Sequence, residues 1–556
     1  MKRYEKQGKN NILVVVPTDQ KAGDWISDGE NLLLDIRQLN DTNDAGQDGE
    51  VIVTTYANMR ANEGLQERDF DLVMYDESHK LSSGQGKETT TTDKAHKYLS
   101  NAPDEAFEKA AKKIVGPKPV IQKVEYRDDM MDQELQRKRQ KEKRSREQLA
   151  KWKEEVKKRE SEIQEEADRM INDTKVVFLS ASPFSYHFNL DYADGYLFTI
   201  VQGKKQTFNG YNAPSDYDKF YMNHFGYQMK YNKLTIPESG VDVDLMERNF
   251  FEGLVESGAA STRTLDLEFD YSRDFVLLDD DLGAKIDTGR SIIRNDDNED
   301  VSLQPLQDEL KKRFNWVNTN RLLEGIKSRE VVDRIQEHLD MGRQVVLFHN
   351  FKTGSVQHPF KFEERSPVNL TDTTKEDVEA YNKAVDYWNK KYSEYANLDL
   401  SGLKSTIDTI TDEFGSRTMI INGDVSKRKR RRNIEKFNDD ESGVDIAVVQ
   451  IDAGKEGISL HDTTGNKPRV MINVGLPVKP TDALQSEGRI YRIGQQSDAI
   501  IEYPVIHTNF EIGIFGDRIN NRVKTAENLA LGEKARSLEL SFRDGFLAAQ
   551  PFAPSE

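Results

Sequence analysis

The chain has 556 residues, of which 36% are hydrophobic and 32% charged, and its net charge is −18 at pH 7. This length exceeds what one hydrophobic core organises, so we expect two or more domains. No apolar run approaches the roughly 20 residues of a membrane-spanning helix, and the absence of cysteine excludes disulfides and thiolate zinc sites.

The N-terminal residues are basic, but the apolar run that follows them, 12–16, is too short for a signal peptide. Together with the lack of cysteine, this predicts a cytoplasmic protein of a bacterial or virus-infected cell, or a nuclear protein in a eukaryote, with no membrane partner. Because the chain is so acidic, any nucleic-acid contact must come from local basic patches.

Four short apolar runs rich in β-branched residues are typical of buried parallel strands. They cover residues 12–17, 51–56, 70–75 and 175–179. Helical stretches separate them, and polar residues follow their C-terminal ends. This is the pattern of an open α/β sheet, which binds ligands at its strand ends.

The third run leads directly into Asp76-Glu77-Ser78-His79, and the fourth leads into Ser180-Ala181-Ser182. An acidic residue after a buried strand can hold Mg²⁺ through its water shell, and its neighbour can orient an attacking water. The alternative is that Asp76 and Glu77 only cap the following helix.

A charged segment without glycine or proline, 131–170, lies inside a helical insertion of about residues 100–172. Apolar residues recur in it every seven positions, which predicts one long helix with a narrow apolar seam: Leu149, Val156, Ile163 and Met170. Its basic part, 137–146, fits a coiled-coil arm that touches DNA or a partner. A solvated antiparallel helical hairpin is the alternative, and we favour it.

Residues 201–330 are expected to form a connecting region, rich in aromatic and acidic residues at first and helical after Leu306. Four more strand-like runs follow, at 343–348, 418–421, 444–451 and 469–474. A polar helical insertion at about 352–414 separates the first two. We interpret its aromatic residues as local packing: Tyr381, Trp388, Tyr392 and Tyr395.

The strongest basic cluster of the chain is Lys427–Arg432. It fits either a helix start aimed at phosphates or a solvated face. Residues 452–462 then read DAGKEGISLHD, in which small residues such as Gly454 and Gly457 let backbone N–H groups approach a phosphate.

Residues 482–495 read DALQSEGRIYRIGQ. We predict Arg489 and Arg492, three positions apart, on the same face of a helix. A planar guanidinium that keeps its charge suits the charge that develops on a transferring phosphoryl group. An ordinary solvated arginine pair is the alternative.

In this order the residues resemble the motifs of superfamily-two helicases and translocases. The resemblance is closest to the Strawberry-notch and phage DarB-like group, with Swi/Snf-type translocases next, and it spans about residues 10–530 apart from the insertions. The resembling segments are Pro17-Thr18 with Trp25 (motif Ia), Thr54-Thr55-Tyr56 (the next DNA-contacting motif), Asp76–His79 (motif II, a DEAH-like box), Ser180–Ser182 (motif III), Ser257–Leu265 (a segment after the first lobe), Asp452–Asp462 (motif V) and Gln485–Gln495 (motif VI).

The resemblance implies an α/β fold of two RecA-like lobes with parallel sheets, which bind ATP and Mg²⁺ in the cleft between them. The N-terminal lobe would cover residues 1–200, the connecting region 201–330, the C-terminal lobe 331–530 and a tail 531–556. Closing and opening of the lobes would move the protein along DNA.

The resemblance also implies roles for individual residues. Asp76 would hold Mg²⁺, Glu77 would polarise the attacking water, and the full catalytic set would be Asp76, Glu77, His79, Gln485, Arg489 and Arg492. The nucleotide-binding or coupling set would be Ser180, Ser182, Asp452, Gly454 and Gly457. DNA contacts, mainly to the backbone and hence sensitive to salt, would come from Thr18, Thr54, Thr55, Ser459, Lys427 and Arg428.

One part of the family pattern is missing, because the chain contains no Gly-x-x-x-x-Gly-Lys-Ser/Thr. The family has this P-loop before motif Ia, so we expect a first lobe that is incomplete at its N-terminus. We expect either a fragment or split form, whose P-loop lies on another chain, or a lobe that has lost catalysis.

The leading hypothesis is an ATP-dependent DNA helicase or translocase motor. Two alternatives are open. One is a non-catalytic DNA-binding or virion assembly protein on a decayed helicase fold, and the other is a scaffold whose function lies in residues 131–170.

Overall fold

The computed structural model describes the chain except for residues 83–90, 124–131, 181–182, 185, 201–206, 209–210, 213, 232, 263–267, 279–280, 295–300, 355–356, 367–373, 455–457, 476–479, 515–519, 532–549 and 552–556. The chain divides into two compact units. The first is Met1–Thr262 with Glu527–Gly532, and the second is Arg263–Ala526 with Glu533–Glu556.

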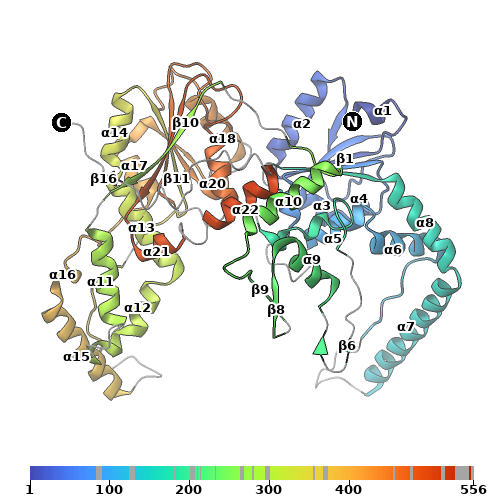
Figure 1. Ribbon diagram of the computed structural model, residues 1–556, viewed down its shortest axis with the longest axis horizontal. Coiled ribbons are helices and arrows are strands. Elements are labelled where there is room, and N and C mark those ends of the chain that lie inside the picture. The colour runs from blue at the N-terminus through green and yellow to red at the C-terminus, as the bar shows by residue number, and fades with distance from the viewer. Residues whose placement is uncertain are drawn as a thin grey trace. The chain divides into compact units, whose positions relative to one another are not determined.

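A five-stranded parallel sheet forms the centre of the first unit (Figure 1). Its strand order is β2-β3-β1-β4-β5. Its strands are β1 (Ile12–Val16), β2 (Ile36–Gln38), β3 (Val51–Thr55), β4 (Leu72–Asp76) and β5 (Lys175–Leu179). All of β1 is buried, as its unbroken apolar sequence predicts for a strand covered on both faces. The four strands predicted for this lobe are confirmed, and the short β2 is an addition.

Helices and an aromatic cluster cover the two faces of this sheet. On one face α2 (Asp19–Asn31) packs through Ala22 against Val14 and Val53. The other face packs on α3 (Tyr56–Ala61), α5 (Thr91–Leu99), α9 (Asp216–Phe225) and α10 (Val243–Glu256). Smaller elements of this unit include α1 (Lys2–Glu5), α4 (Glu63–Gln66), η2 (His187–Asn189), η3 (Asp191–Ala193), β6 (Thr207–Phe208), β7 (Tyr211–Asn212), β8 (Gln228–Lys230) and β9 (Lys233–Thr235).

The charged insertion consists of α6 (Pro103–Val115), α7 (Asp132–Lys158) and α8 (Glu160–Asp173). The single helix predicted over 131–170 is therefore wrong, since it breaks at Arg159 (φ −108°, ψ 18°). There the Arg159 guanidinium donates to the Ile114 carbonyl at the end of α6 (2.7 Å) and to Glu162. Ile163 and Met170 of the apolar seam are buried against α6, so α6 and α8 pair within this chain.

A larger parallel sheet forms the centre of the second unit, in the order β12-β13-β11-β14-β15-β10-β16. Its strands are β10 (Tyr271–Leu277), β11 (Gln344–His349), β12 (Thr418–Ile421), β13 (Ile446–Gln450), β14 (Arg469–Asn473), β15 (Ala499–Val505) and β16 (Gln550–Pro551). The four strands predicted for this half are confirmed. β10, β15 and β16 were not predicted.

The helices of the second unit cover both faces of this sheet and form a helical extension. One face carries α18 (Lys427–Phe437), α19 (Ile451–Gly454) and α20 (Pro480–Glu487), and the other carries α14 (Val332–Asp340) and α17 (Thr406–Phe414). The extension is built from α11 (Leu282–Arg294), η4 (Val301–Leu306), α12 (Gln307–Arg313), α13 (Trp316–Glu330), α15 (Lys375–Lys391) and α16 (Ser393–Ala396). The unit also contains α21 (Asn509–Ile512) and most of α22 (Asn520–Leu531).

The aromatic residues of the second insertion pack locally, as predicted. Trp388 is fully buried and donates its indole N–H to the Phe360 carbonyl (2.9 Å). Tyr381 is also buried in the same cluster. None of them forms an exposed stacking platform.

The segment predicted as one connecting region, 201–330, is divided between the two units at Thr262. Its aromatic residues Phe220, Tyr221 and Phe250 lie in the core of the first unit, whereas β10 lies inside the second sheet. Within the described part of the chain, no helix is long and apolar enough to cross a membrane.

Candidate functional site

Asp76 and Glu77 lie at the C-terminal end of β4, where the strand gives way to a short 3-10 helix, η1 (Ser78–Leu81). The Trp25 indole N–H donates to Asp76 Oδ2 (2.9 Å), and the Tyr56 hydroxyl donates to the Asp76 carbonyl (2.9 Å). Glu77 has left-handed backbone angles (φ 56°, ψ 52°), which a non-glycine residue adopts at a cost of roughly 1–2 kcal/mol. The Trp25 contact fixes the Asp76 carboxylate, and the Tyr56 contact fixes the backbone at the point where Glu77 begins.

His79 joins this carboxylate pair to the next strand. Its Nδ1 lies 3.2 Å from Ser180 Oγ and 3.4 Å from Glu77 Oε2. Asp76 is opposite Leu179 in the parallel ladder, so Ser180 follows directly at the neighbouring strand end. The structure thus brings together Asp76, Glu77, His79 and Ser180, whereas Ser182 lies outside the described residues.

The three threonines proposed to contact DNA have structural roles in the first unit. Thr18 and Thr55 cap the starts of α2 and α3, since their side chains accept the N–H groups of Lys21 and Asn58. Thr54 is 0% exposed and its hydroxyl donates to the Leu39 carbonyl (3.3 Å). The prediction of a DNA contact for Thr54 is wrong, because a buried hydroxyl engaged inside the sheet cannot reach a phosphate.

Arg489 and Arg492 lie beyond the end of α20, in a turn that ends with Gly494 at φ 94°. Their predicted placement on one helix face is therefore wrong. α20 stops at Glu487, just before Gly488, a residue that weakens helix continuation. Gln485 lies in the last turn of α20, and its carbonyl accepts a hydrogen bond from Arg489 Nε (3.0 Å).

The two arginines bind the segment that follows β13. Arg489 donates to the Ile458 carbonyl (3.1 Å), and its own carbonyl accepts the Leu460 N–H (2.9 Å). Arg492 donates to Ser459 Oγ (2.5 Å). Two segments about 30 residues apart in sequence are thus joined, with Ser459 held inside the second unit.

The other residues predicted near Ser459 differ in their surroundings. Gly454 is buried, and a Cβ there would meet Val449 Cγ1 at 2.0 Å, so packing against β13 requires glycine at this position. Asp452 is exposed on α19. Gly457 lies outside the described residues, and so does the side chain of Lys427.

Two buried carboxylates within the predicted segments 452–462 and 482–495 stabilise this arrangement, although the sequence predicted no role for either residue. Asp462 accepts the Ser497 hydroxyl (2.7 Å) and the Gly465 N–H (3.0 Å). Burial alone would raise the pKa of Asp462, but these donors lower it. Glu487 pairs with Arg273 of β10 (2.6 Å), and both side chains are less than a tenth exposed. Asp462 lies in a loop between His461 and Thr463, and Glu487 lies between Ser486 and Gly488 at the end of α20, so no local sequence pattern marks either residue as buried.

The basic helix α18 begins at Lys427, with Ser426 as its cap. Arg428, Lys429, Arg431, Arg432 and Lys436 are exposed on it. Arg431 pairs with Glu435 (3.1 Å), and Arg430 donates to the Asn422 carbonyl (3.1 Å). Most of the positive charge therefore faces outward.

Glu324 of α13 is a buried carboxylate that holds the loop after β11. It accepts the N–H groups of Asn350 (2.8 Å) and Phe351 (2.9 Å). Burial raises the pKa of Glu324 to about 7, although these donors and Thr406 act to lower it. A single glutamate inside the apolar sequence LLEGI was the signal that could have identified it.

The raised pKa predicts a pH-dependent stability. The stabilising contribution of Glu324 is complete below about pH 4.5 and is lost as the pH rises to about 7. We expect the Glu324→Gln variant to gain about 2–3 kcal/mol relative to the wild type over this range in urea unfolding. His349, 4.0 Å away, changes with the opposite sign because burial lowers its pKa to about 4. The difference in the free energy of unfolding between the wild type and Glu324→Gln isolates the contribution of Glu324. A difference that does not vary with pH would contradict the prediction.

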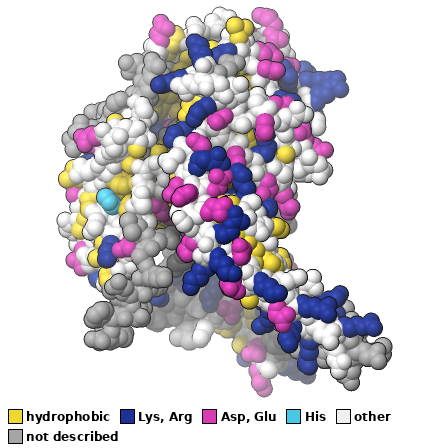
Figure 2. Space-filling model, turned by 90° about the vertical axis from the view of Figure 1, so that its right-hand side faces the viewer, with side chains coloured by type: hydrophobic (Ala, Val, Ile, Leu, Met, Phe, Trp, Pro, Cys, Tyr) yellow, Lys and Arg dark blue, Asp and Glu magenta, His cyan; other side chains and the backbone are white. Residues whose placement is uncertain are grey.

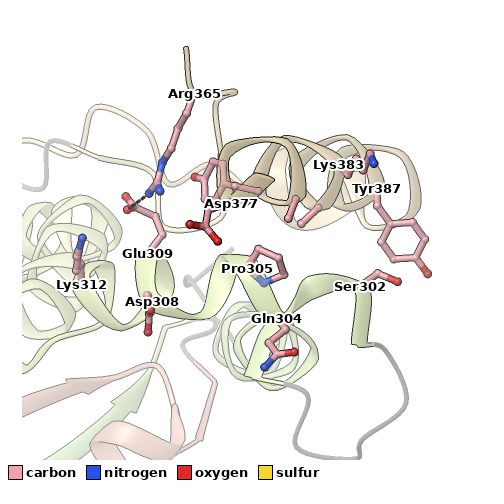
Figure 3. Close-up of a pocket in the computed structure, with 13 residues that line it drawn as sticks. Ser302, Gln304, Pro305, Asp308, Glu309, Lys312, Arg365, Asp377, Lys383 and Tyr387 are labelled. Carbon is pink, nitrogen blue, oxygen red and sulfur yellow. Dashed lines mark hydrogen bonds and ion pairs between the residues drawn. The ribbon is translucent and has the colours of Figure 1, made fainter. Parts of the chain in front are cut away.

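A hollow of 880 Å³ lies in the helical extension, between η4–α12 and α15 (Figure 3). In it Arg365 pairs with Glu309 (3.0 Å) and lies 3.8 Å from the Tyr381 ring centroid. Its lining carries both signs of charge, and it includes none of the predicted site residues. We assign it no catalytic role.

The carboxylates at the end of β4 fit a magnesium ion. Among the residues that the structure describes, no three acidic or histidine side chains converge as a metal site. Mg²⁺ is commonly held by one or two carboxylates together with substrate phosphates. A single Asp76, fixed by Trp25, matches that requirement.

Comparison with known families identifies part of the second unit. Residues 389–494 match the helicase conserved C-terminal domain. These residues of the second unit are therefore similar to a helicase C-terminal domain. The match includes α18, the segment around Ser459 and both arginines. No curated protein matches the chain.

Three solved structures show weak likeness to the chain. The DUF1998 helicase MrfA bound to DNA is 11% identical (TM-score 0.36), over 94% of this chain and 44% of that one. MrfA bound to DNA and AMPPNP is 9% identical (TM-score 0.31), over 91% and 43%. The SWI2/SNF2 ATPase core of Sulfolobus solfataricus with dsDNA is 13% identical (TM-score 0.21), over 91% and 79%. The chain thus spans less than half the length of MrfA.

Proposed function

We propose that the chain forms most of the motor of an ATP-dependent nucleic-acid helicase or translocase, of the Strawberry-notch or phage DarB-like group. One observation carries the proposal. The helicase C-terminal domain match, 389–494, contains the contacts that join Ile458 and Ser459 to Arg489 and Arg492. Its place of action would be the cytoplasm of a bacterial or virus-infected cell, or a eukaryotic nucleus.

ATP and Mg²⁺ would supply the transferred phosphoryl group and the charge that neutralises it. Asp76 would hold the metal through water, and Glu77, fixed in its left-handed turn, would orient and deprotonate the attacking water. Arg489 and Arg492 would stabilise the charge that develops on the phosphoryl group. The His79–Ser180 contact would couple this chemistry to the strand ends of the first unit.

The sequence contains no P-loop, and in the proposed motor a separate polypeptide would supply this loop. The completed protein, meaning this chain together with a polypeptide that carries a P-loop, should hydrolyse ATP at least about 100-fold faster than the chain alone. A completed protein that contains the loop but gains no activity would count against the motor.

The missing loop also favours a second candidate, a non-catalytic DNA-binding or virion assembly protein on a decayed helicase fold. DNA binding would then be tight and indifferent to ATP. It would also be unchanged by Arg489→Ala with Arg492→Ala.

The exposed face of α18 provides a test of the nucleic-acid partner. We expect Arg428→Gln, Lys429→Gln and Arg432→Gln together to weaken DNA binding at least about tenfold and to reduce the slope of log K against log salt by about 2–3. Fluorescence anisotropy with a labelled duplex measures both. A matched control removes three exposed lysines of the helical extension, Lys311, Lys312 and Lys390, and equal losses in the two variants would exclude α18 as the contact.

A further inference from the structure

The insertion of the first unit has an uneven distribution of charge. Residues 137–146 of α7 contain seven lysines and arginines and one glutamate. α8, at the other end of the insertion, contains six acidic residues and one arginine. In a chain of net charge −18, such a basic segment is a local exception.

One face of α7 is already covered by this chain. Ser145 is buried and its hydroxyl accepts the Gln122 N–H (3.2 Å), while the Trp152 indole donates to the Gly116 carbonyl (2.9 Å). Val156 packs with the α6–α8 cluster. The apolar seam is thus occupied within the chain, so a coiled-coil partner has no apolar stripe to bind here.

The basic residues lie on the two flanks of that covered face. Arg137, Lys141 and Arg144 share one flank at the spacing i, i+4, i+7, and Arg139, Lys143 and Arg146 share the other. All six are exposed, although Arg146 pairs with Glu142 (2.6 Å). Figure 2 views the molecule from the side on which α7 lies, and it shows lysine and arginine side chains gathered at the lower right of the picture.

The helix is long and stiff enough to act as an arm. Its 27 residues span about 40 Å, and the basic part alone about 15 Å. A DNA duplex carries one negative charge per roughly 1.7 Å of its axis. A segment of this length can therefore lie against several phosphates at once, whichever bases they carry.

We propose that residues 137–146 of α7 form a nucleic-acid backbone-binding arm, separate from the helicase C-terminal domain and active without nucleotide. The proposal rests on the nucleic-acid partner of the proposed function. Binding would be independent of sequence, and it would keep the first unit attached to the strand between catalytic steps.

Two charge-matched variants of the full chain test the arm. The first is Arg137→Gln, Lys141→Gln, Lys143→Gln and Arg144→Gln. The control is Lys151→Gln, Lys153→Gln, Lys157→Gln and Lys158→Gln, in the half of α7 where three glutamates offset four lysines. Both remove four cations from one helix, replace them with good helix formers and leave Ser145 and Trp152 unchanged. Circular dichroism confirms that both variants fold.

Binding of a labelled 30-base-pair duplex is measured by anisotropy without nucleotide, at KCl concentrations from about 50 to 200 mM. We expect the first variant to bind at least about tenfold more weakly at the lowest salt, with a salt slope reduced by about 2–4, and the control to change less than about twofold. Equal effects in both variants would overturn the proposal. So would a loss of binding to phosphatidylserine vesicles with unchanged DNA binding, which would assign the arm to membranes.

The outcome separates the arm from the motor. If the first variant loses affinity while the completed protein never hydrolyses ATP, the arm stands and the proposed function fails. If ATP hydrolysis is present but the first variant binds DNA like the wild type, the arm fails and the motor stands.

Discussion

Replacing Glu77 with glutamine is expected to lower kcat for ATP hydrolysis by the completed protein by about 10²–10⁴-fold. The amide keeps the size of the side chain but cannot accept a proton from the attacking water. Because Tyr56 and Trp25 hold Asp76 independently, the strand end should keep its geometry. A coupled-enzyme assay at saturating ATP measures the loss.

Glu30→Gln serves as the control for Glu77, since Glu30 is an exposed carboxylate on α2 of the same unit. It should leave kcat within about twofold of the wild type. DNA affinity should be unchanged in both variants. Hydrolysis by Glu77→Gln at the rate of the control would remove Glu77 from the catalytic set.

Removing the arginines after α20 is the second change with a large expected effect. We expect Arg492→Ala to lower kcat by about 10³-fold or more, as for other arginines that stabilise a phosphoryl transition state. Arg492→Lys should recover little of this, because an ammonium lacks the planar fork of a guanidinium. Single-turnover hydrolysis separates this loss from any change in ATP binding.

Arg489→Ala should combine the loss of hydrolysis with a larger loss of stability than Arg492→Ala, which removes the hydrogen bond to Ser459 Oγ. Arg489 donates to two backbone carbonyls, those of Gln485 and Ile458. Its loss should therefore also lower the free energy of unfolding, by about 1–3 kcal/mol. Arg329→Ala, in an exposed pair with Asp399, is the matched control and should change neither quantity much. Normal hydrolysis by both Arg489→Ala and Arg492→Ala would contradict the role of these arginines in stabilising the transition state.

The strands and their polar ends were predictable because both sheets are parallel and buried on both faces. Runs such as ILVVV and VVLF therefore remain unbroken in the sequence. The C-terminal ends of neighbouring strands lie at one edge of a sheet, which explains why Asp76 and Ser180 come together.

The missed strands contain charged residues whose partners are distant in sequence. β10 includes Arg273, which is buried only because Glu487 pairs with it, 214 residues later. β15 includes Glu502, buried against His338 (3.1 Å). In a single sequence, the charged residues of such pairs look like exposed positions. Residues 271–277 were therefore predicted to belong to a connecting region.

The predicted helices failed where local chemistry overrides periodicity. The seven-residue repeat in the charged insertion continues across Arg159, although the helix does not, because Arg159 binds the end of α6. Likewise, the spacing of Arg489 and Arg492 predicted that both lie on a helix, but α20 ends at Glu487, before either arginine. Spacing alone did not show that both arginines bind the segment around Ser459.

The central claim, that this chain belongs to an ATP-driven nucleic-acid motor, is tested most directly by the steady-state rate of ATP hydrolysis by the completed protein with and without duplex DNA. We predict hydrolysis that DNA stimulates at least about tenfold and that Glu77→Gln abolishes. A completed protein that binds DNA but hydrolyses ATP no faster than its Glu77→Gln variant would contradict the claim.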